Sequence, residues 1–255
     1  MPPAVLPASQ RRLALDTVAS TNGALLERAA AGEPAGLWVT AREQAAGRGR
    51  SGRAWASPAG NLYASFLVRP RVGLAIAQQL SLAVPVAAYD AVATLAGGTP
   101  AAGLRLKWPN DLLLGGAKLS GILLETSVHP AHGLAVAIGV GLNLASHPEN
   151  LDQPATHLAA HGIAADPEEA LAALAGALAA WLAKWADGSG FAAVREAWMA
   201  RAGAPGEALS VRTGQGRLDG RYRGLDAAGA LRLEVPDGRI VTFSHGDVAL
   251  RTPER

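Results

Sequence analysis

The pattern of the chain changes abruptly at Gly203-Ala-Pro-Gly206. A cluster of glycine and proline of this kind interrupts regular structure. Before it, segments with helical and with extended periodicity alternate, and after it only short extended segments joined by Gly and Asp turns remain. We therefore predict two domains, 1–203 and 204–255, the second a small antiparallel barrel without a helix. Its predicted strands are Leu209–Thr213, Arg217–Leu225, Ala230–Val235, Arg239–Phe243 and Val248–Arg251.

The first domain combines strands with helices. Proline cannot donate in a central ladder, so the strand that begins at Leu104 is expected to end at Pro109. Pro85 is expected to kink the second helix or to mark its entry. The other predicted strands are Arg12–Val18, Gly36–Thr40, Asn61–Val68 and Ala135–Leu144, with a hairpin of Leu112–Leu114 and Ala117–Glu125. The predicted helices are Gly23–Ala31, Ile76–Leu95, Pro167–Ala186 and Phe191–Arg201.

Composition excludes several classes of protein. The 255 residues are 49% hydrophobic, enough for a sizeable core, and the absence of cysteine excludes disulfides and fits a reducing cytoplasm. A net charge of +2 gives no broad nucleic-acid footprint. The first residues make a poor secretory signal. The Ala/Leu-rich runs at 74–96 and 168–186 contain polar or charged residues, so we interpret them as buried or amphipathic helices and expect no membrane partner.

The stretch from Gln44 to Trp55 interleaves three glycines with three arginines. Glycine lets the backbone adopt positive φ, and arginine offers a permanent charge and a planar fork of donors. A loop of both can fold around an anion, and Trp55 adds a flat apolar face. We interpret it as a mobile clamp for a phosphorylated or adenylated small molecule.

Two other interpretations of this loop stay open. Gly47-Arg-Gly-Arg-Ser-Gly52 formally matches a dinucleotide-binding fingerprint, but that pattern counts only where a helix follows, and here Pro58 follows closely. The stretch could also be an RNA-binding Arg-Gly segment, although it is short, unrepeated and set inside a globular chain.

Lysine is scarce and clustered. Only three of the 23 basic residues are lysines, and two of them, Lys107 and Lys118, lie close to Asn110 and Asp111. Lysine is a compact point charge that arginine does not replace, which favours a specific chemical role. Regular alternation would place Lys118, Ser120 and Ile122 on one face of their strand. The alternative is an edge lysine that reaches solvent.

Three further features could serve a ligand. Ser20-Thr21-Asn22 could simply cap the helix that follows, or could offer hydroxyls and N–H groups to a polar ligand. Gly139 and Gly141, two apart in a strand, leave one face bare for a close approach. His157 and His161 have the spacing of a helical zinc pair, but no third ligand is apparent, so we predict no high-affinity metal site.

Four motifs, in order and with similar spacing, resemble those of the biotin–protein ligases. They are Gly47-Arg-Gly-Arg-Ser-Gly-Arg53, Lys107-Trp-Pro-Asn-Asp111, Lys118-Leu-Ser-Gly-Ile-Leu-Leu-Glu125 and Gly139-Val-Gly-Leu-Asn143; Ser20-Thr21-Asn22 and Gln44 fit as well. The match covers residues 9–251. It implies an α+β fold, with a mixed β-sheet catalytic domain that is flanked by helices and related to class II aminoacyl-tRNA synthetases, followed by an SH3-like barrel.

The resemblance also implies a reaction in two steps. Biotin and Mg-ATP give biotinyl-5′-AMP and pyrophosphate, and the ε-amine of a lysine on a biotin carboxyl carrier protein then takes the biotinyl group. Because the first step brings two anions together, fixed cations must neutralise their repulsion, and Arg48 and Lys118 are suitable residue types. No enzyme nucleophile is needed, so the lack of cysteine is no obstacle.

The family motifs assign roles to individual residues. Ser20, Thr21, Asn22 and Gln44 would hold the ureido end of biotin. Arg48, Gly49 and Arg50 would close over the carboxylate and α-phosphate, Lys118 would bridge them, and Trp55 would pack on adenine. Lys107, Asn110 and Asp111 would serve the nucleotide–Mg²⁺ side, which makes Arg48, Lys118, Lys107 and Asp111 the catalytic candidates. Gly47, Gly121, Gly139 and Asn143 complete the predicted substrate-binding set.

Two departures from the family pattern matter. Some members have a basic residue where this chain has Ser51, so this loop is expected to hold the adenylate less strongly. Only 19 residues precede Ser20, too few for a DNA-binding domain, so we expect the short enzymatic form without a DNA partner.

The main alternatives are a lipoate–protein ligase with the same fold and adenylation chemistry, and a nucleic-acid-binding regulator. Near-neutral net charge argues against the regulator. A homodimer through edge strands of the sheet is a further hypothesis, because C₂ homodimers are common.

Overall fold

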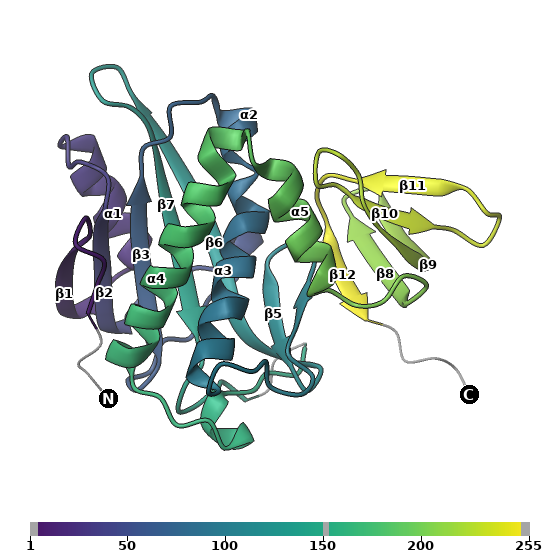
Figure 1. Cartoon of the computed structure of the whole chain (residues 1–255), viewed down its shortest axis with the longest axis horizontal. Helices are drawn as coiled ribbons and strands as arrows, with labels where there is room; N and C mark the ends of the chain where they lie inside the picture. Colours follow the sequence, from purple (N-terminus) through teal and green to yellow (C-terminus); the bar gives the residue numbers. More distant parts are fainter. Residues whose placement is uncertain (1–4, 150–152, 251–255) are drawn as a thin grey trace.

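The computed structural model describes residues 5–149 and 153–250, which form two sheets linked by helices (Figure 1). The first sheet has seven strands in the order β1-β2-β3-β7-β6-β5-β4. These strands are β1 (Arg11–Val18), β2 (Leu37–Gln44), β3 (Leu62–Val68), β4 (Arg105–Lys107), β5 (Asp111–Leu114), β6 (Ala117–His129) and β7 (Gly133–Leu142). β1 pairs with β2 in parallel and the other neighbours are antiparallel, so the predicted mixed sheet is confirmed.

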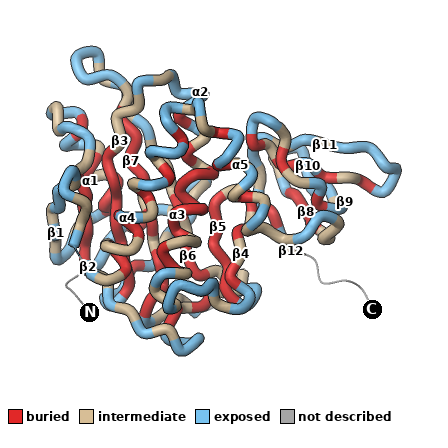
Figure 2. Tube along the Cα trace, viewed as in Figure 1, coloured by how far each residue is buried: buried red, intermediate tan, exposed pale blue. Residues whose placement is uncertain are grey.

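Helices cover both faces of this sheet. On one face lie α3 (Leu80–Leu95), α4 (Pro167–Trp185) and α5 (Phe191–Ala200), whose buried residues share one hydrophobic cluster with β3, β6 and β7. On the other face, α1 (Thr21–Ala30) packs on β2, β3 and β7 through a separate small cluster. The central strands are therefore buried on both sides (Figure 2).

Within the described ranges, one helix, at Pro167–Gly188, is long and apolar enough to cross a membrane, with a mean hydropathy of 1.2. Its α4 portion packs along α3 and buries Leu171, Leu178 and Trp185 in the main cluster. A core helix passes the same test of length and composition, and this one contributes to the core as the sequence predicted.

The second sheet is antiparallel, with the order β11-β10-β9-β8-β12. Its strands are β8 (Ala208–Thr213), β9 (Gly216–Leu225), β10 (Leu231–Glu234), β11 (Ile240–Phe243) and β12 (Asp247–Leu250). All five predicted strands are present, although Arg251, the last residue of the fifth, lies outside the described residues. Leu209, Tyr222 and Leu231 of this sheet belong to the main hydrophobic cluster, so the two sheets share a continuous core.

Pro85 does not mark the entry of a helix. α2 (Leu74–Ala77) is a short separate turn, and α3 begins at Leu80 and runs through Pro85. The break therefore falls at Gln78 and Gln79. Packing decides this, because ten residues of α3 are buried and the helix is held by its neighbours on both sides of the proline.

The prediction that Lys118, Ser120 and Ile122 share one face is wrong. Along β5, Leu112 pairs with Ser120 but Leu113 pairs with Lys118, so Leu119 is an extra residue in β6. Such a β-bulge shifts the alternation by one position. Ser120 and Ile122 consequently point into the protein, whereas Lys118 and Gly121 both lie against the Trp55 ring.

The corner between α4 and α5 generates a prediction about stability. A Cβ on Gly190 would overlap the carbonyl oxygen of Lys184, and backbone atoms cannot easily move aside. We expect Gly190→Ala to lower the free energy of unfolding by about 3 kcal/mol, the upper range for an overpacked site.

The matched control is Gly176→Ala in α4, where a Cβ meets no heavy atom within 4 Å. Alanine favours a helix by about 1 kcal/mol over glycine, so this variant should gain stability in urea unfolding. Equal stability of both variants would contradict the packed corner.

Candidate active site

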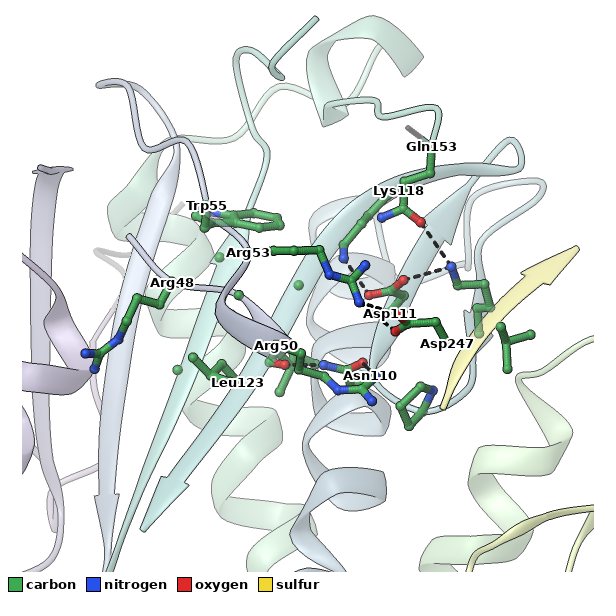
Figure 3. A pocket seen from close by; sticks show the side chains of 18 of the residues that line it. Arg48, Arg50, Arg53, Trp55, Asn110, Asp111, Lys118, Leu123, Gln153 and Asp247 are labelled. Atoms are coloured by element: carbon green, nitrogen blue, oxygen red, sulfur yellow. Dashed lines mark hydrogen bonds and ion pairs between the residues drawn. The ribbon is translucent and has the colours of Figure 1, made fainter. Parts of the chain in front are cut away.

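A cavity of about 800 Å³ lies where the loop after β2, the ends of β4–β7 and the second sheet meet (Figure 3). It is lined by most of the residues that the sequence singled out. From the predicted set these are Ser20, Thr21, Asn22, Gln44, Arg48, Gly49, Arg50, Trp55, Lys107, Asn110, Asp111, Lys118, Gly121 and Gly139. Segments that are 90 residues or more apart in the chain therefore converge on one cavity.

One end of the cavity is a buried network of mostly neutral polar groups, which also reaches the Glu125 carboxylate through Asn22 Nδ2 at 2.9 Å. The backbone N–H and hydroxyl of Thr21 donate to Gln44 Oε1 at 2.9 and 3.1 Å, and Gln44 Nε2 donates to Ser57 Oγ at 2.9 Å. Ser65 Oγ lies 2.8 Å from Thr21 Oγ1 and 2.6 Å from Asn22 Oδ1.

The capping interpretation of Ser20-Thr21-Asn22 is confirmed, and a contact with a polar ligand stays a prediction. Ser20 accepts a hydrogen bond from the Gly23 N–H and caps α1, while Thr21 and Asn22 line the cavity. The network consists of fixed donors and acceptors, which is the environment that binds a neutral polar ligand.

The floor of the cavity is a strand surface without side chains. A Cβ on Gly139 would stand 2.6 Å from Asn22 Oδ1, and one on Gly141 would stand 2.5 Å from Trp55 Nε1. Gly121, the partner of Gly141 across β6 and β7, carries the other edge of the indole. The predicted bare face is confirmed, and Trp55 lies flat on part of it. Within the described residues, the buried Trp55 Nε1 has no hydrogen-bond partner.

The opposite end holds a buried ionic triad. Asp111 Oδ2 pairs with Lys107 Nζ at 2.9 Å and Oδ1 with Lys118 Nζ at 2.7 Å, and all three side chains are less than 20% exposed. Lys107 also donates to Gln153 Oε1 at 3.2 Å. Burial alone would raise the pKa of Asp111, but the two ammonium groups outweigh it and hold the pKa below its ordinary value. Lys118 is thus no edge lysine in solvent.

Each of the three arginines of the loop has different partners. Arg48 pairs with Glu125 at 3.0 Å, and Arg53 pairs with Asp247 of β12 at 2.6 Å. Arg50 donates to the neutral oxygens of Asn110 Oδ1 at 3.1 Å and Gly246 O at 3.2 Å. The loop therefore spans the cavity from the first sheet to the second. Burial lowers the pKa of Arg50, opposed by the nearby Asp247 and Asp111 carboxylates, yet a guanidinium remains charged at neutral pH.

Two consecutive residues with positive φ, Ser51 and Gly52, give the loop its bend. Ser51 has φ 55°, in the left-handed region that L-residues seldom adopt. It lies between Arg50 and Gly52 in the short helical turn Arg50–Gly52, which no periodicity predicts.

Two predicted residues lie outside this cavity. Gly47 and Asn143 line a smaller cavity of about 340 Å³ on the other side of Trp55. Asn143 Nδ2 donates to the Thr156 carbonyl at 2.9 Å, and a Cβ on Gly47 would overlap the Trp55 carbonyl oxygen. Both residues therefore support the loop and the segment around Thr156. Gln44, Trp55 and Lys118 border both cavities.

Sequence reasoning missed several residues at the site. Glu125 and Arg53 stand inside recognised motifs and could have been proposed as a pair of loop anchors. Ser57, Ser65 and Gln153 give no signal in the sequence, because only the fold brings them to the cavity. Asp247, Arg212 and Arg217 come from the second sheet, which the sequence did not connect with the site.

No group of three or more His, Cys, Asp or Glu that could hold a metal exists within residues 5–149 and 153–250. Of the predicted histidine pair, His157 Nδ1 lies 2.7 Å from His147 Nδ1, whereas His161 Nε2 lies 2.8 Å from Thr156 Oγ1. Asp111 is already shared by two ammonium groups. A cation such as Mg²⁺ would therefore have to enter with a polyanionic ligand that brings its own oxygen atoms.

Comparisons with known proteins agree on one family. A model of the biotin/lipoate A/B protein ligase family matches residues 15–143, and a model of the biotin protein ligase C terminal domain matches residues 206–251. A biotin--[acetyl-CoA-carboxylase] ligase of Paracoccus denitrificans is 46% identical over 228 residues, 87% of this chain and 93% of that protein. One of Mycobacterium tuberculosis is 40% identical over 92% of this chain and 88% of that protein.

Among solved structures, the biotin protein ligase from Aquifex aeolicus in complex with biotin and ATP is similar with a TM-score of 0.78. It is 28% identical, and the alignment covers 94% of this chain and 98% of that chain.

The ionic triad generates a prediction about stability and pH. Asp111→Asn leaves two ammonium groups facing each other, so we expect it to lower the free energy of unfolding by on the order of 3 kcal/mol at pH 7. Because the folded pKa of Asp111 is depressed, this stabilisation is complete above the unfolded value of about 3.9 and is lost as pH falls through the folded value. Urea unfolding of both proteins from pH 7 downward measures it.

The matched control is Asp16→Asn, which removes a carboxylate that is 90% exposed and lies 3.8 Å from Arg42. We expect a change below about 0.5 kcal/mol there. Equal effects of the two substitutions would show that the buried triad has no special role in stability.

Proposed function

Since the chain belongs to the biotin/lipoate A/B protein ligase family, we propose that it is a biotin–protein ligase. It activates biotin with ATP to biotinyl-5′-AMP and transfers the biotinyl group to a lysine of a biotin carboxyl carrier protein. One observation carries the proposal: a single cavity joins a neutral polar network at one end to converging cations at the other. The polar end suits an acid with a neutral polar head, and the cationic end suits a nucleotide, so a reaction between the two would need both ends.

The polar end suits the ureido group of biotin. Thr21, Asn22 and Gln44 supply hydroxyl and amide groups that Ser57 and Ser65 hold in place. The bare glycine face beside them admits a flat bicyclic ring against the backbone. Ser20 contributes through the cap that fixes this end of α1.

The cationic end suits the adenylation step. The carboxylate of biotin attacks the α-phosphorus of ATP, the bond to the β-phosphate breaks, and pyrophosphate leaves. Arg48, Arg50 and Lys118 neutralise the two approaching anions and the charge that develops between them. Mg²⁺ accompanies the phosphates of ATP and offsets their charge. Lys107, Asn110 and Asp111 orient this side, with Asp111 holding both ammonium groups in position.

In the second step, no residue of the enzyme has to form a covalent bond with biotin. The ε-amine of the carrier lysine attacks the mixed anhydride directly and displaces AMP. The loop from Gly47 to Trp55 covers the anhydride and excludes water, which would otherwise hydrolyse it. We assign the Trp55 indole, which lies on the glycine floor, to contact with adenine.

The proposal includes finer structural and cellular details. The first domain is related to class II aminoacyl-tRNA synthetases, the second is SH3-like, and the boundary lies at residue 203. The protein works in the cytoplasm and can form a homodimer through a sheet edge; a monomer mass in sedimentation at assay concentration would reject the dimer.

The reaction is tested by ATP–pyrophosphate exchange with biotin, lipoate or neither added. We expect exchange that depends on biotin, because adenylation is reversible before the carrier enters. Exchange with lipoate instead would keep the mechanism and correct the substrate. No exchange with either acid, in folded protein with Mg²⁺, would reject the ligase and favour a binding protein.

The loop generates a second prediction. Arg50→Gly removes two hydrogen bonds that tie the loop to Asn110 and Gly246, so the loop should close less often. We expect free biotinyl-5′-AMP to leave the protein about ten-fold faster, the effect of losing about one charge-assisted hydrogen bond. Rapid desalting followed by quantification of retained adenylate measures this. The control is Arg71→Gly, at an exposed bend away from the cavity. Equal retention of the adenylate by wild type, Arg50→Gly and Arg71→Gly would contradict the role of Arg50.

A further inference from the structure

Two arginines of the second sheet face the same cavity from its far wall. Arg212 of β8 is directly opposite Arg217 of β9, and on its other side it is opposite Asp247 of β12. All three line the cavity. Cross-strand neighbours in an antiparallel sheet have side chains on the same face, so the three form a row.

The charges in this row are unevenly paired. Asp247 accepts both hydrogen bonds of Arg53 at 2.6 Å, and Arg217 pairs with Asp219 at 3.0 Å. Within the described part of the chain, the Arg212 guanidinium has neither an ion pair nor a hydrogen bond. Like charges directly opposite each other destabilise a strand pair, and Asp247, the carboxylate of this row, is hydrogen-bonded to Arg53 and not to Arg212. Its charge is therefore available to an anion from outside.

The surrounding cavity has the same imbalance. Six cationic side chains line this end, namely Lys107, Lys118, Arg50, Arg53, Arg212 and Arg217, against the two carboxylates of Asp111 and Asp247. An excess of fixed positive charge in a concave site attracts polyanions and raises their local concentration.

We propose that Arg212, supported by Arg217, is a specificity-determining contact for the β- and γ-phosphates of ATP and for the pyrophosphate that they become. This inference rests on the proposed adenylation. In that step a biotin carboxylate of charge −1 and ATP of charge −4 give an adenylate of charge −1 and pyrophosphate of charge −4. Most of the negative charge therefore leaves with pyrophosphate, and in this proposal Arg212, which has no acidic partner, faces it. The second sheet thereby takes part in binding the triphosphate.

An acidic surface of the carrier protein is the other anion that could meet Arg212. The position favours the phosphates, because Arg212 lines the cavity together with Lys107 and Arg50. The two cases differ in the step that they affect: phosphates act only in adenylation, and the carrier acts only in transfer.

The test compares wild type, Arg212→Ala and Arg212→Lys in biotin-dependent exchange. We expect Arg212→Ala to raise KM for ATP and for pyrophosphate about five-fold, the upper end for an exposed ion pair, with KM for biotin unchanged. Arg212→Lys should recover part of the loss, and the difference should shrink at high salt because exposed charges are screened. Arg232→Ala, exposed on β10 and outside the cavity, is the control and should match wild type.

Transfer from purified biotinyl-5′-AMP to the carrier is measured in the same variants and should not change. Unchanged KM for ATP in Arg212→Ala would overturn the inference, and slower transfer from the adenylate with unchanged exchange would assign Arg212 to the carrier instead. If wild type shows no biotin-dependent exchange, the proposed function fails, and calorimetry with inorganic pyrophosphate still decides the inference. Weaker pyrophosphate binding by Arg212→Ala supports it and equal binding rejects it.

Discussion

One extra residue in β6 determines which groups of that strand reach the cavity. The bulge at Leu119 turns Lys118 and Gly121 to the same side, three positions apart in a strand where regular alternation would separate them. Lys118 can then meet Asp111, and Gly121 can support Trp55. Without the bulge, Lys118 and Ser120 would share one face. Either the lysine would then point into the hydrophobic core, or Ser120 and Ile122 would face the cavity in place of Gly121. Charge and apolar packing at the site therefore have a common origin in strand register.

The loop and the second sheet depend on this arrangement. Trp55 anchors the loop on the glycine face, and from there Arg50 and Arg53 extend to Gly246 and Asp247. The continuous hydrophobic cluster fixes the position of the second sheet against the first, which makes such contacts reproducible.

Much of this structure can be predicted from the sequence, because the signals are local. Alternation and turn residues indicate the strands, Gly139 and Gly141 indicate a bare face, and the spacing of Lys107 and Asp111 indicates a charged cluster. The bulge at Leu119 leaves no such signal, since its cause is the pairing with β5. The same holds for Ser65 and Asp247, which reach the site only through tertiary packing. The entry of α3 was misplaced for a related reason: burial of the helix overrides the local cost of Pro85.

The balance of charge explains how the site stays ordered and still has affinity left for anions. One carboxylate, Asp111, serves two ammonium groups, so the triad retains a net positive charge in a buried place. Arg50 is held by the neutral oxygens of Asn110 and Gly246, and the nearby carboxylates of Asp247 and Asp111 are bound by other cations. A site in which every cation had its own carboxylate would have to break those pairs before an anion could bind. Arg48 and Arg53 are in that position, because they pair with Glu125 and Asp247. Arg50 and the triad are already placed without such pairs, and an incoming phosphate or carboxylate completes pairs that the protein leaves incomplete there.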